Sequence, residues 1–343
     1  MSHFTLLAQF TEEESNKILS YSTDSVRYQA MQNLLEEKLL PFKEGTSDLP
    51  EQYKEFCVAA TVEELEQEFK VGKFSVLKDH DGRELPYSEK TYVEYYKTLD
   101  NYIKEYHGYK KHNGEYGYWR NPNAKWDWWQ IGGRWSCSLR RKPQAVSGVN
   151  QEHIDYIKKN QNLYGDYKFK NNSCDWCLTK DYDHEADCKS AEEDIDEFIS
   201  DYYKFIEMEN SSKPWEEYTK EEKEFQNNHF YYGERLARLG IRTVVKVREP
   251  IYNQDGTPTG EFSKPVFQDI AFDKNFLMEK KYMFEFSTYA ILTESGEWIA
   301  PGEMGWFGAS SESNDDVDLF KKNYKSLAFK NPNSIICVVD CHI

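Results

Sequence analysis

Two apolar runs at opposite ends of the chain restrict its fold more than any other feature. Residues 3–10 (HFTLLAQF) and residues 335–340 (IICVVD) are the most apolar segments of strand length in the 343 residues. Strands that are apolar at nearly every position are buried on both faces of a sheet. The sequence therefore predicts that these two segments occupy central positions in one sheet.

Helical patterns fill most of the chain between these two runs. Apolar residues spaced by three and four, or a Ser or Thr followed three residues later by Glu, are typical of helices. These patterns predict helices over residues 24–39, 61–69, 88–106, 151–164, 190–208, 219–239 and 316–327. Further strands are predicted at residues 241–248 and, as a hairpin, at residues 288–299.

This order of elements favours an α+β fold, with a mostly antiparallel sheet built from N- and C-terminal strands and a helical insertion in the middle. We expect a single elaborated domain over residues 1–343, in which residues 145–285 form an insertion of helices and a hairpin. Aromatic residues make up 16% of the chain, and disordered chains are poor in aromatics. The chain should therefore be globular, with a core rich in rings.

The charge balance limits the partners. The formal net charge is −17, from 43 basic and 60 acidic residues, which argues against extended nucleic acid as a partner because such binding needs a positive surface. An acidic surface can instead approach basic grooves on other proteins. No apolar stretch approaches the ~20 residues that span a bilayer, and residues 1–15 lack the pattern of a secretory signal. We therefore expect a cytoplasmic protein without a membrane partner.

The densest group of chemically informative residues is the segment 121–135 (NPNAKWDWWQIGGRW). In an extended segment Trp126 and Trp128 lie on one face, whereas Asp127 points to the opposite face. Tryptophans can stack on a planar ligand, and Lys125 and Arg134 can bind phosphate or carboxylate. The alternative is an aromatic corner of the core, which Trp135 would join, with Asp127 and Arg134 as a structural ion pair.

The last predicted strand ends in residue types that are unusual there. Asp340 and His342 end that strand, and His3 begins the first one. If the two strands are neighbours, two imidazoles and a carboxylate could hold a divalent metal ion or act as general acid and base. The alternative is a frayed end whose polar residues lie in water.

A glycine-rich loop at residues 301–308 (PGEMGWFG) is the third candidate. Glu303 is its single carboxylate and could act as a base or bind a ligand amine, with Trp306 beside it. The alternative is a tight turn in which Trp306 fills the core.

A group of cysteines is the fourth candidate. Cys174 and Cys177 form a CxxC pair, and His184 and Cys188 follow within a dozen residues. Such residues can bind zinc, but a second regularly spaced pair is missing. The alternative is free thiols, which an odd total of seven cysteines also favours.

The same motifs carry a family resemblance. MSHFT at residues 1–5, the segment 121–135, GEWIAPGEMGWFG at 296–308 and VVDCHI at 338–343 make the chain similar to a family of uncharacterised bacteriophage and bacterial proteins. The cysteine group is not among its motifs. If the chain is phage-encoded, its location would be the host cytoplasm. The resemblance implies that distant motif residues meet at one sheet edge, namely His3, Lys125, Trp126, Asp127, Arg134, Trp135, Glu303, Trp306, Asp340 and His342.

Together these patterns lead to one hypothesis and one rival. The hypothesis is a phage-type accessory protein whose pocket binds a small anionic, nucleotide-like ligand and could hydrolyse it. Asp127, Glu303, Asp340 and His342 would then be acid–base or metal candidates. The rival is a non-enzymatic acidic protein that inhibits a host nucleic-acid-binding or defence protein. The rival predicts a fully buried tryptophan segment beside a continuous carboxylate surface.

Overall fold

The computed structural model describes residues 3–75, 78–83, 85, 88–149, 151–159, 172–210, 217, 219–220, 239, 241–252, 258–269, 273–303 and 311–343. The chain divides into two compact units. The first, the sheet unit, contains Met1–Leu34 and Trp128–Ile343, and the second, the inserted unit, contains Leu35–Asp127. The expected single domain with its insertion at residues 145–285 stays a prediction.

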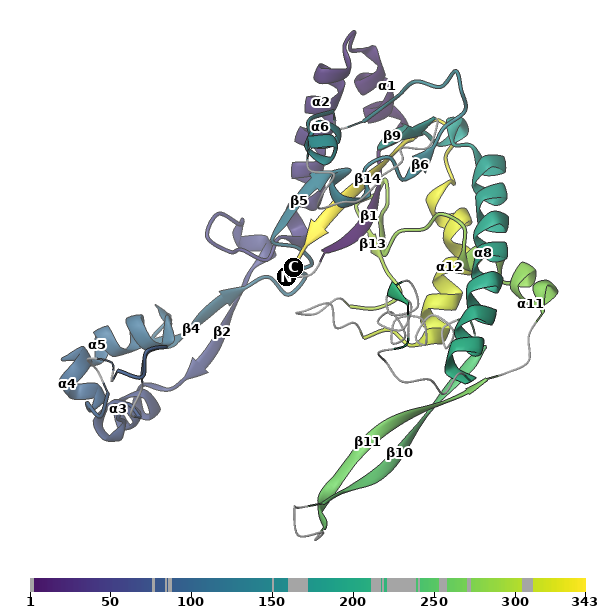
Figure 1. The fold of residues 1–343 in the computed structure, drawn as a ribbon. Helices are drawn as coiled ribbons and strands as arrows, with labels where there is room; N and C mark the ends of the chain where they lie inside the picture. Colours follow the sequence, from purple (N-terminus) through teal and green to yellow (C-terminus); the bar gives the residue numbers. More distant parts are fainter. Residues whose placement is uncertain are drawn as a thin grey trace. The chain divides into compact units, whose positions relative to one another are not determined.

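A mixed sheet forms the centre of the sheet unit. Strands β1 (His3–Gln9) and β14 (Ile335–His342) are antiparallel neighbours over their whole length, from His3 opposite His342 to Gln9 opposite Ile336. Both strands are almost entirely buried. This confirms the central positions predicted from the two apolar runs and shows that the two strands are neighbours. Figure 1 shows the two ends of the chain close together as a result.

Five further strands complete this sheet in the order β13-β12-β1-β14-β9-β7, with β5 also paired to β14. Only the pairing of β1 with β12 is parallel, and the other pairings in the sheet are antiparallel. The fold is therefore α+β with a mostly antiparallel sheet, as predicted. The bounds are β5 Trp128–Ile131, β7 Ser147–Gly148, β9 Trp176–Leu178, β12 Ala290–Leu292 and β13 Trp298–Ile299.

Helix α12 (Asn314–Ala328) packs against one face of this sheet. Its Phe320 and Tyr324 contact the cluster that contains Leu7 of β1 and Val338 of β14. Ser313 caps the helix, because its hydroxyl oxygen accepts a hydrogen bond from the Asp316 amide. The predicted helix at residues 316–327 is thus confirmed, and its cap fixes the start two residues earlier.

The remaining helices of the sheet unit differ from the predictions mainly in where they begin. Helix α8 (His184–Asn210) starts six residues before the predicted Ser190, because the Asp183 carboxylate accepts from the Ala186 amide and caps an earlier turn. Ser190 lies inside the helix and accepts from Arg140. The other helices are α1 Glu12–Ser20, α6 Gln151–Lys159, η4 Gly133–Trp135, η5 Thr179–Asp181, α11 Lys274–Glu279 and η7 Lys281–Met283.

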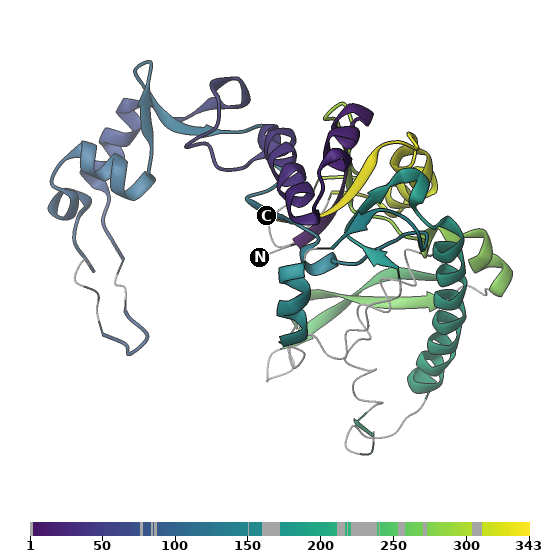
Figure 2. The same ribbon diagram turned by 90° about the horizontal axis from the view of Figure 1, so that it is seen from above.

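Two small sheets lie outside the central one. Strands β6 (Leu139–Arg140) and β8 (Ser173–Cys174) pair with each other. Strands β10 (Arg242–Tyr252) and β11 (Pro258–Asp269) form a long antiparallel ribbon that is a sheet of its own, drawn in green in Figures 1 and 2. Residues 253–257 between these two strands and most of the predicted helix at 219–239 lie outside the described residues.

The inserted unit has its own sheet and core. Strands β2 (Glu55–Ala60), β4 (Glu115–Arg120) and β3 (Lys110–His112) pair in that order. Leu65, Tyr96 and Tyr102 lie in its buried cluster. Helix α2 (Asp24–Leu39) enters this unit from the preceding chain, and the other bounds are η1 Leu40–Phe42, η2 Glu51–Tyr53, α3 Val62–Val71, α4 Tyr92–Tyr96 and α5 Leu99–Tyr102.

One continuous helix over residues 88–106 was the wrong prediction in this unit. Lys97 adopts a positive φ of 67° and ends α4. The Thr98 hydroxyl oxygen then accepts from the Asn101 amide and begins α5, which continues as a π-helical turn, η3 (Ile103–His107). Spacing alone cannot detect such a break, because the aromatic side chains on both sides still reach one core.

Candidate functional site

The junction of β1, β14 and β5 brings several predicted site residues together. His342 is the register partner of both His3 on β1 and Trp128 on β5. Side chains alternate along a strand, so Asp340 shares a face of β14 with His342. The rings confirm this grouping, because the His3 centroid lies 4.9 Å from that of His342 and 6.2 Å from that of Trp128. We call His3, Trp128, Arg134, Asp340 and His342 the junction cluster.

The Asp340 carboxylate organises this cluster. It is fully buried, and its Oδ1 lies 2.8 Å from His3 Nδ1. Its Oδ2 accepts a hydrogen bond of 2.9 Å from the Arg134 backbone amide. When Asp340 is ionised it can only accept, and the hydrogen in the first contact then belongs to His3 Nδ1. In a neutral His3 the lone pair is then on Nε2, where the imidazole can take up a proton.

Two glycines allow the Arg134 amide to reach this carboxylate. Gly132 and Gly133 have φ values of 72° and 55°, which residues with a Cβ rarely adopt. A Cβ on Gly133 would also overlap with the Asp340 side chain, and a Cβ on Gly132 would overlap with Asp175. Both properties of glycine, tolerance of a positive φ and room for close approach, are therefore used at this turn.

Asp175 is a structural residue that the sequence patterns did not reveal. It is fully buried, and its carboxylate accepts a hydrogen bond from the Cys137 amide just after the glycine turn. Its own backbone carbonyl accepts from the Val338 amide of β14 at 2.8 Å. Two buried carboxylates, Asp340 and Asp175, therefore hold the two ends of the turn 132–137. No motif spacing marks Asp175, because its partners are backbone amides.

Two side chains of the junction cluster are exposed, namely the guanidinium of Arg134 and the indole of Trp128. The Arg134 side chain is exposed and has no hydrogen bond or ion pair with the described residues. Trp128 is 45% exposed, although adjacent tryptophans usually pack in a core. By contrast, Trp135 packs against the core cluster under α12. The predicted ligand-binding tryptophans of this unit therefore divide into one exposed ring and one scaffold ring.

The first half of the tryptophan segment belongs to the inserted unit. There Trp126 is buried, and its Nε1 donates a 3.0 Å hydrogen bond to the Leu39 carbonyl. Lys125 is half-buried, and its amide donates to the Phe42 carbonyl. Asp127 is exposed. Trp126 thus has a structural role, and participation of Lys125 and Asp127 in a common site with the junction cluster stays a prediction.

Of the glycine-rich loop 301–308, the structure describes only residues 301–303, and Glu303 among them acts on Tyr289, which precedes β12. The Tyr289 amide donates to the Thr5 hydroxyl, and Thr5 pairs with Asp340 across β1 and β14. Burial and then the charges of Glu312 and Glu303 raise the pKa of Tyr289 to about 12. Glu303, whose amide donates to Ser311, therefore acts electrostatically on Tyr289. Trp306 lies outside the described residues.

The cysteine group gives no support to a zinc site. Cys174 and Cys177 are buried together, and a hydrogen bond from the Cys174 thiol to Cys177 and then burial raise the pKa of Cys174. Cys188 donates to Glu285, and His184 packs edge-on against the stacked rings of Tyr182 and Phe329. In the described part of the chain, no group of three or more His, Cys, Asp or Glu residues could hold a metal ion, the junction cluster included.

Comparisons with known proteins do not identify a function, so the function is inferred from the geometry described above. No protein-family model, curated protein or solved structure matches this chain. Among the described residues, no helix is both long and apolar enough to span a membrane.

Proposed function

We propose that the junction cluster binds a small anionic, planar ligand of the nucleotide class. The single observation that supports this most is the exposed Arg134 guanidinium, which has no partner among the described residues while its backbone amide is anchored on buried Asp340. Arginine binds phosphate and carboxylate through two parallel hydrogen bonds. The anchored backbone reduces the conformational freedom lost on binding.

Trp128 supplies the planar surface for such a ligand. Its ring is 45% exposed and lies at the edge of the His3 imidazole. Stacking of a base on an aromatic ring contributes about 1–3 kcal/mol in proteins that bind single strands. A ligand with a ring and an anionic group would use Trp128 and Arg134 together.

His3 and Asp340 supply a base for hydrolysis of this ligand. The proton of an attacking water would pass to His3 Nε2 while the water oxygen bonds to the phosphorus or carbonyl carbon. The leaving group would depart with the bonding electron pair and then receive that proton. Asp340 would orient the imidazole and stabilise its charged form, as the carboxylate does in serine hydrolases. Asp340 is thus a positioning residue, and His342, 4.9 Å from His3 by ring centroids, would contact the ligand.

The test is direct binding with a matched pair of variants. Nucleoside mono-, di- and triphosphates would be titrated into the full chain while tryptophan fluorescence is measured. Loss of one charge-assisted hydrogen bond costs about 1.5–3 kcal/mol, so Arg134→Ala should weaken binding by about tenfold or more. Arg83→Ala, at another exposed arginine, should leave binding unchanged. Equal affinity of the Arg134→Ala variant and the unmodified chain would contradict the proposal.

The rival function, inhibition of a basic host protein by an acidic surface, is favoured by the net charge of −17. It predicts a fully buried tryptophan segment, whereas Trp128, Asp127 and Arg134 are exposed. Mass spectrometry of small molecules and metals released from purified protein separates the two proposals. A ligand lost in Arg134→Ala supports the junction site, and protein that is empty in both forms supports the rival. The phage accessory role implied by the motifs stays a prediction.

A further inference from the structure

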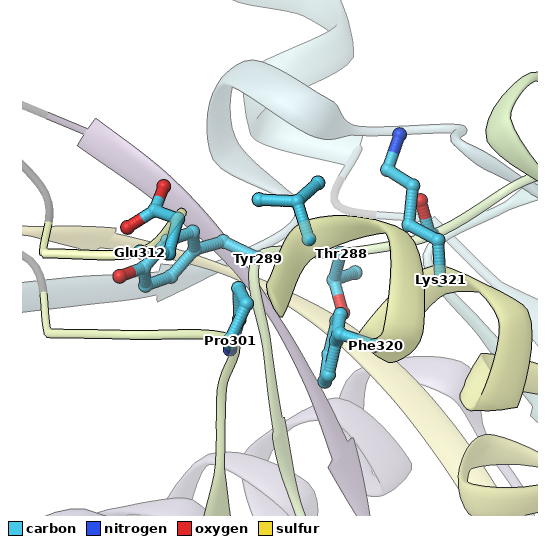
Figure 3. A pocket seen from close by; sticks show the side chains of 8 residues that line it. Thr288, Tyr289, Pro301, Glu312, Phe320 and Lys321 are labelled. Atoms are coloured by element: carbon cyan, nitrogen blue, oxygen red, sulfur yellow. The ribbon is translucent and has the colours of Figure 1, made fainter. Parts of the chain in front are cut away.

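A cavity in the sheet unit lies apart from the junction cluster, on the opposite side of β1 from β14. It has a volume of about 200 Å³. Its lining comes from the chain before β12, from the loop after β13 and from the start of α12, as Figure 3 shows. The lining residues within the described part of the chain are Ser287, Thr288, Tyr289, Pro301, Glu312, Val317, Phe320 and Lys321.

Two polar atoms of this lining are buried without a hydrogen-bond partner among the described residues. They are the Tyr289 hydroxyl oxygen and the Glu312 Oε2. Figure 3 places both groups at the same end of the cavity. Buried polar atoms nearly always have a partner in folded proteins, and each exception calls for an explanation. A ligand that donates hydrogen bonds would satisfy both atoms at once.

Two other polar residues of the lining, Thr288 and Lys321, already have partners. The Thr288 hydroxyl contacts the Ala290 carbonyl at 2.7 Å and the Tyr324 hydroxyl at 2.9 Å. The Lys321 amine donates to the Met283 carbonyl, and Figure 3 places Lys321 at the other end of the cavity from Glu312. The site for a ligand group is therefore the end formed by Tyr289 and Glu312.

The charges near that end are negative. Glu312 and Glu303 both act on Tyr289, and together with burial they raise the pKa of its hydroxyl. Tyr289 thus stays protonated at neutral pH and can accept a hydrogen bond through its oxygen. A ligand group between a carboxylate and a phenol oxygen must donate hydrogen bonds, and a positive charge would strengthen them.

We propose that this cavity binds a small primary ammonium ligand, with its nitrogen between Glu312 and Tyr289. The carbon chain of the ligand would lie along Pro301, Val317 and Phe320, the apolar part of the lining. One water occupies about 30 Å³ in the liquid, so the cavity has room for roughly six or seven groups of that size. The ligand class is therefore a short alkylammonium ion. This site does not depend on the nucleotide site proposed for the junction cluster.

The probe is butylamine, which is a butylammonium ion at pH 7, titrated into the full chain by isothermal calorimetry. We expect saturable binding of one butylammonium per chain and none of butyrate, its anionic counterpart. Glu312→Gln keeps the shape but removes the charge, so it should weaken binding about tenfold or more. Tyr289→Phe should weaken it severalfold. Glu297→Gln makes the same change at an exposed residue of the neighbouring turn and should leave affinity unchanged.

Three results would overturn this proposal: no saturable butylammonium binding, equal binding of butanol and butylammonium, or unchanged affinity in Glu312→Gln. The first would mean that the cavity holds only water, and the second that it selects apolar volume without charge. If Glu312→Gln fails to fold, Tyr289→Phe decides, because its hydroxyl makes no hydrogen bond with the described residues. Arg134→Ala should bind butylammonium normally, so failure of the nucleotide site would be distinguishable from failure of this one.

Discussion

Replacement of Asp340 tests the junction cluster most directly. Its two carboxylate oxygens make hydrogen bonds with His3 Nδ1 and with the Arg134 amide, and the residue is fully buried. A hydrogen bond to a charged group contributes about 1.5–3 kcal/mol, so the two bonds together contribute about 3–6 kcal/mol. Asp340→Ala removes both and leaves two donors without partners. We expect its free energy of unfolding to fall by about 3–6 kcal/mol, the contribution of the two lost hydrogen bonds.

Asp340→Asn separates the fold from the chemistry. The asparagine oxygen can accept from the Arg134 amide, and its NH₂ group can donate to His3 Nδ1 once the imidazole hydrogen moves to Nε2. Both hydrogen bonds survive in neutral form, and neutral bonds have about half the strength of charge-assisted ones. The expected loss of stability is therefore about 1–3 kcal/mol, and Nε2 no longer has a lone pair to accept a proton.

Two measurements check this reasoning. Urea unfolding followed by tryptophan fluorescence gives the stability of each variant, since Trp128 and Trp129 lie on the strand that pairs with Asp340. Nitrogen-15 NMR of the histidines reports the tautomer, with Nδ1–H expected for His3 in the unmodified chain and Nε2–H in Asp340→Asn. A loss below about 1 kcal/mol in Asp340→Ala, or the same His3 tautomer in both proteins, would refute the assigned role of Asp340.

Three further predictions concern other parts of the sheet unit. Gly133→Ala should destabilise by at least ~1 kcal/mol more than Gly296→Ala in urea unfolding, because both glycines have positive φ but only Gly133 lies against Asp340; equal losses would contradict this contact. Tyr289→Phe should leave the melting temperature unchanged or raise it, since it removes a buried hydroxyl without a partner among the described residues, and a clear decrease would show that the hydroxyl is satisfied. Burial lowers the pKa of His184, and the positive charge of Lys325 lowers it further. His184 therefore binds its proton at a higher pH in the unfolded chain than in the folded one. The free energy of unfolding should therefore fall as the pH decreases from roughly 6.5 through the folded pKa. His184→Gln should reduce this dependence between pH 7 and 5, and an identical slope would exclude His184 as its source.

Strand patterns near the two ends of the chain predicted the centre of the fold well. Leu6, Leu7, Val338 and Val339 are fully buried, and burial on both faces is what continuous apolar runs indicate. Helix ends were predicted less well, because they depend on single side chains such as Asp183 and Thr98 that cap an amide of the next turn. Ser, Thr and Asp are common in this chain, and only the backbone geometry decides which of them become caps.

The sequence predicted which residues belong to the candidate site but not what each of them does there. The types and positions of His3, Asp340 and Arg134 marked them as site candidates, and the register of β1 and β14 explains why two of them meet. Exposure could not be read from the sequence, since Trp128 and Trp135 are the same residue type in one motif but only Trp128 is largely exposed. Tyr289 and Glu312 have no motif at all. Their relevance comes from a cavity that forms only when the start of α12 lies beside β12.

The geometry of the junction cluster depends on apolar residues some distance from it. Side chains alternate along β14, so a slip of one residue against β1 would turn Asp340 to the opposite face, away from His3. What prevents the slip is the pairing of Leu6 with Val339 and of Leu7 with Val338, all four fully buried. Exposure of these residues would cost about 1.5–3 kcal/mol each, comparable to each hydrogen bond of Asp340. The hydrophobic centre of the two strands therefore sets the position of the charged groups, and the charged groups then set the orientation of His3 and the backbone of Arg134.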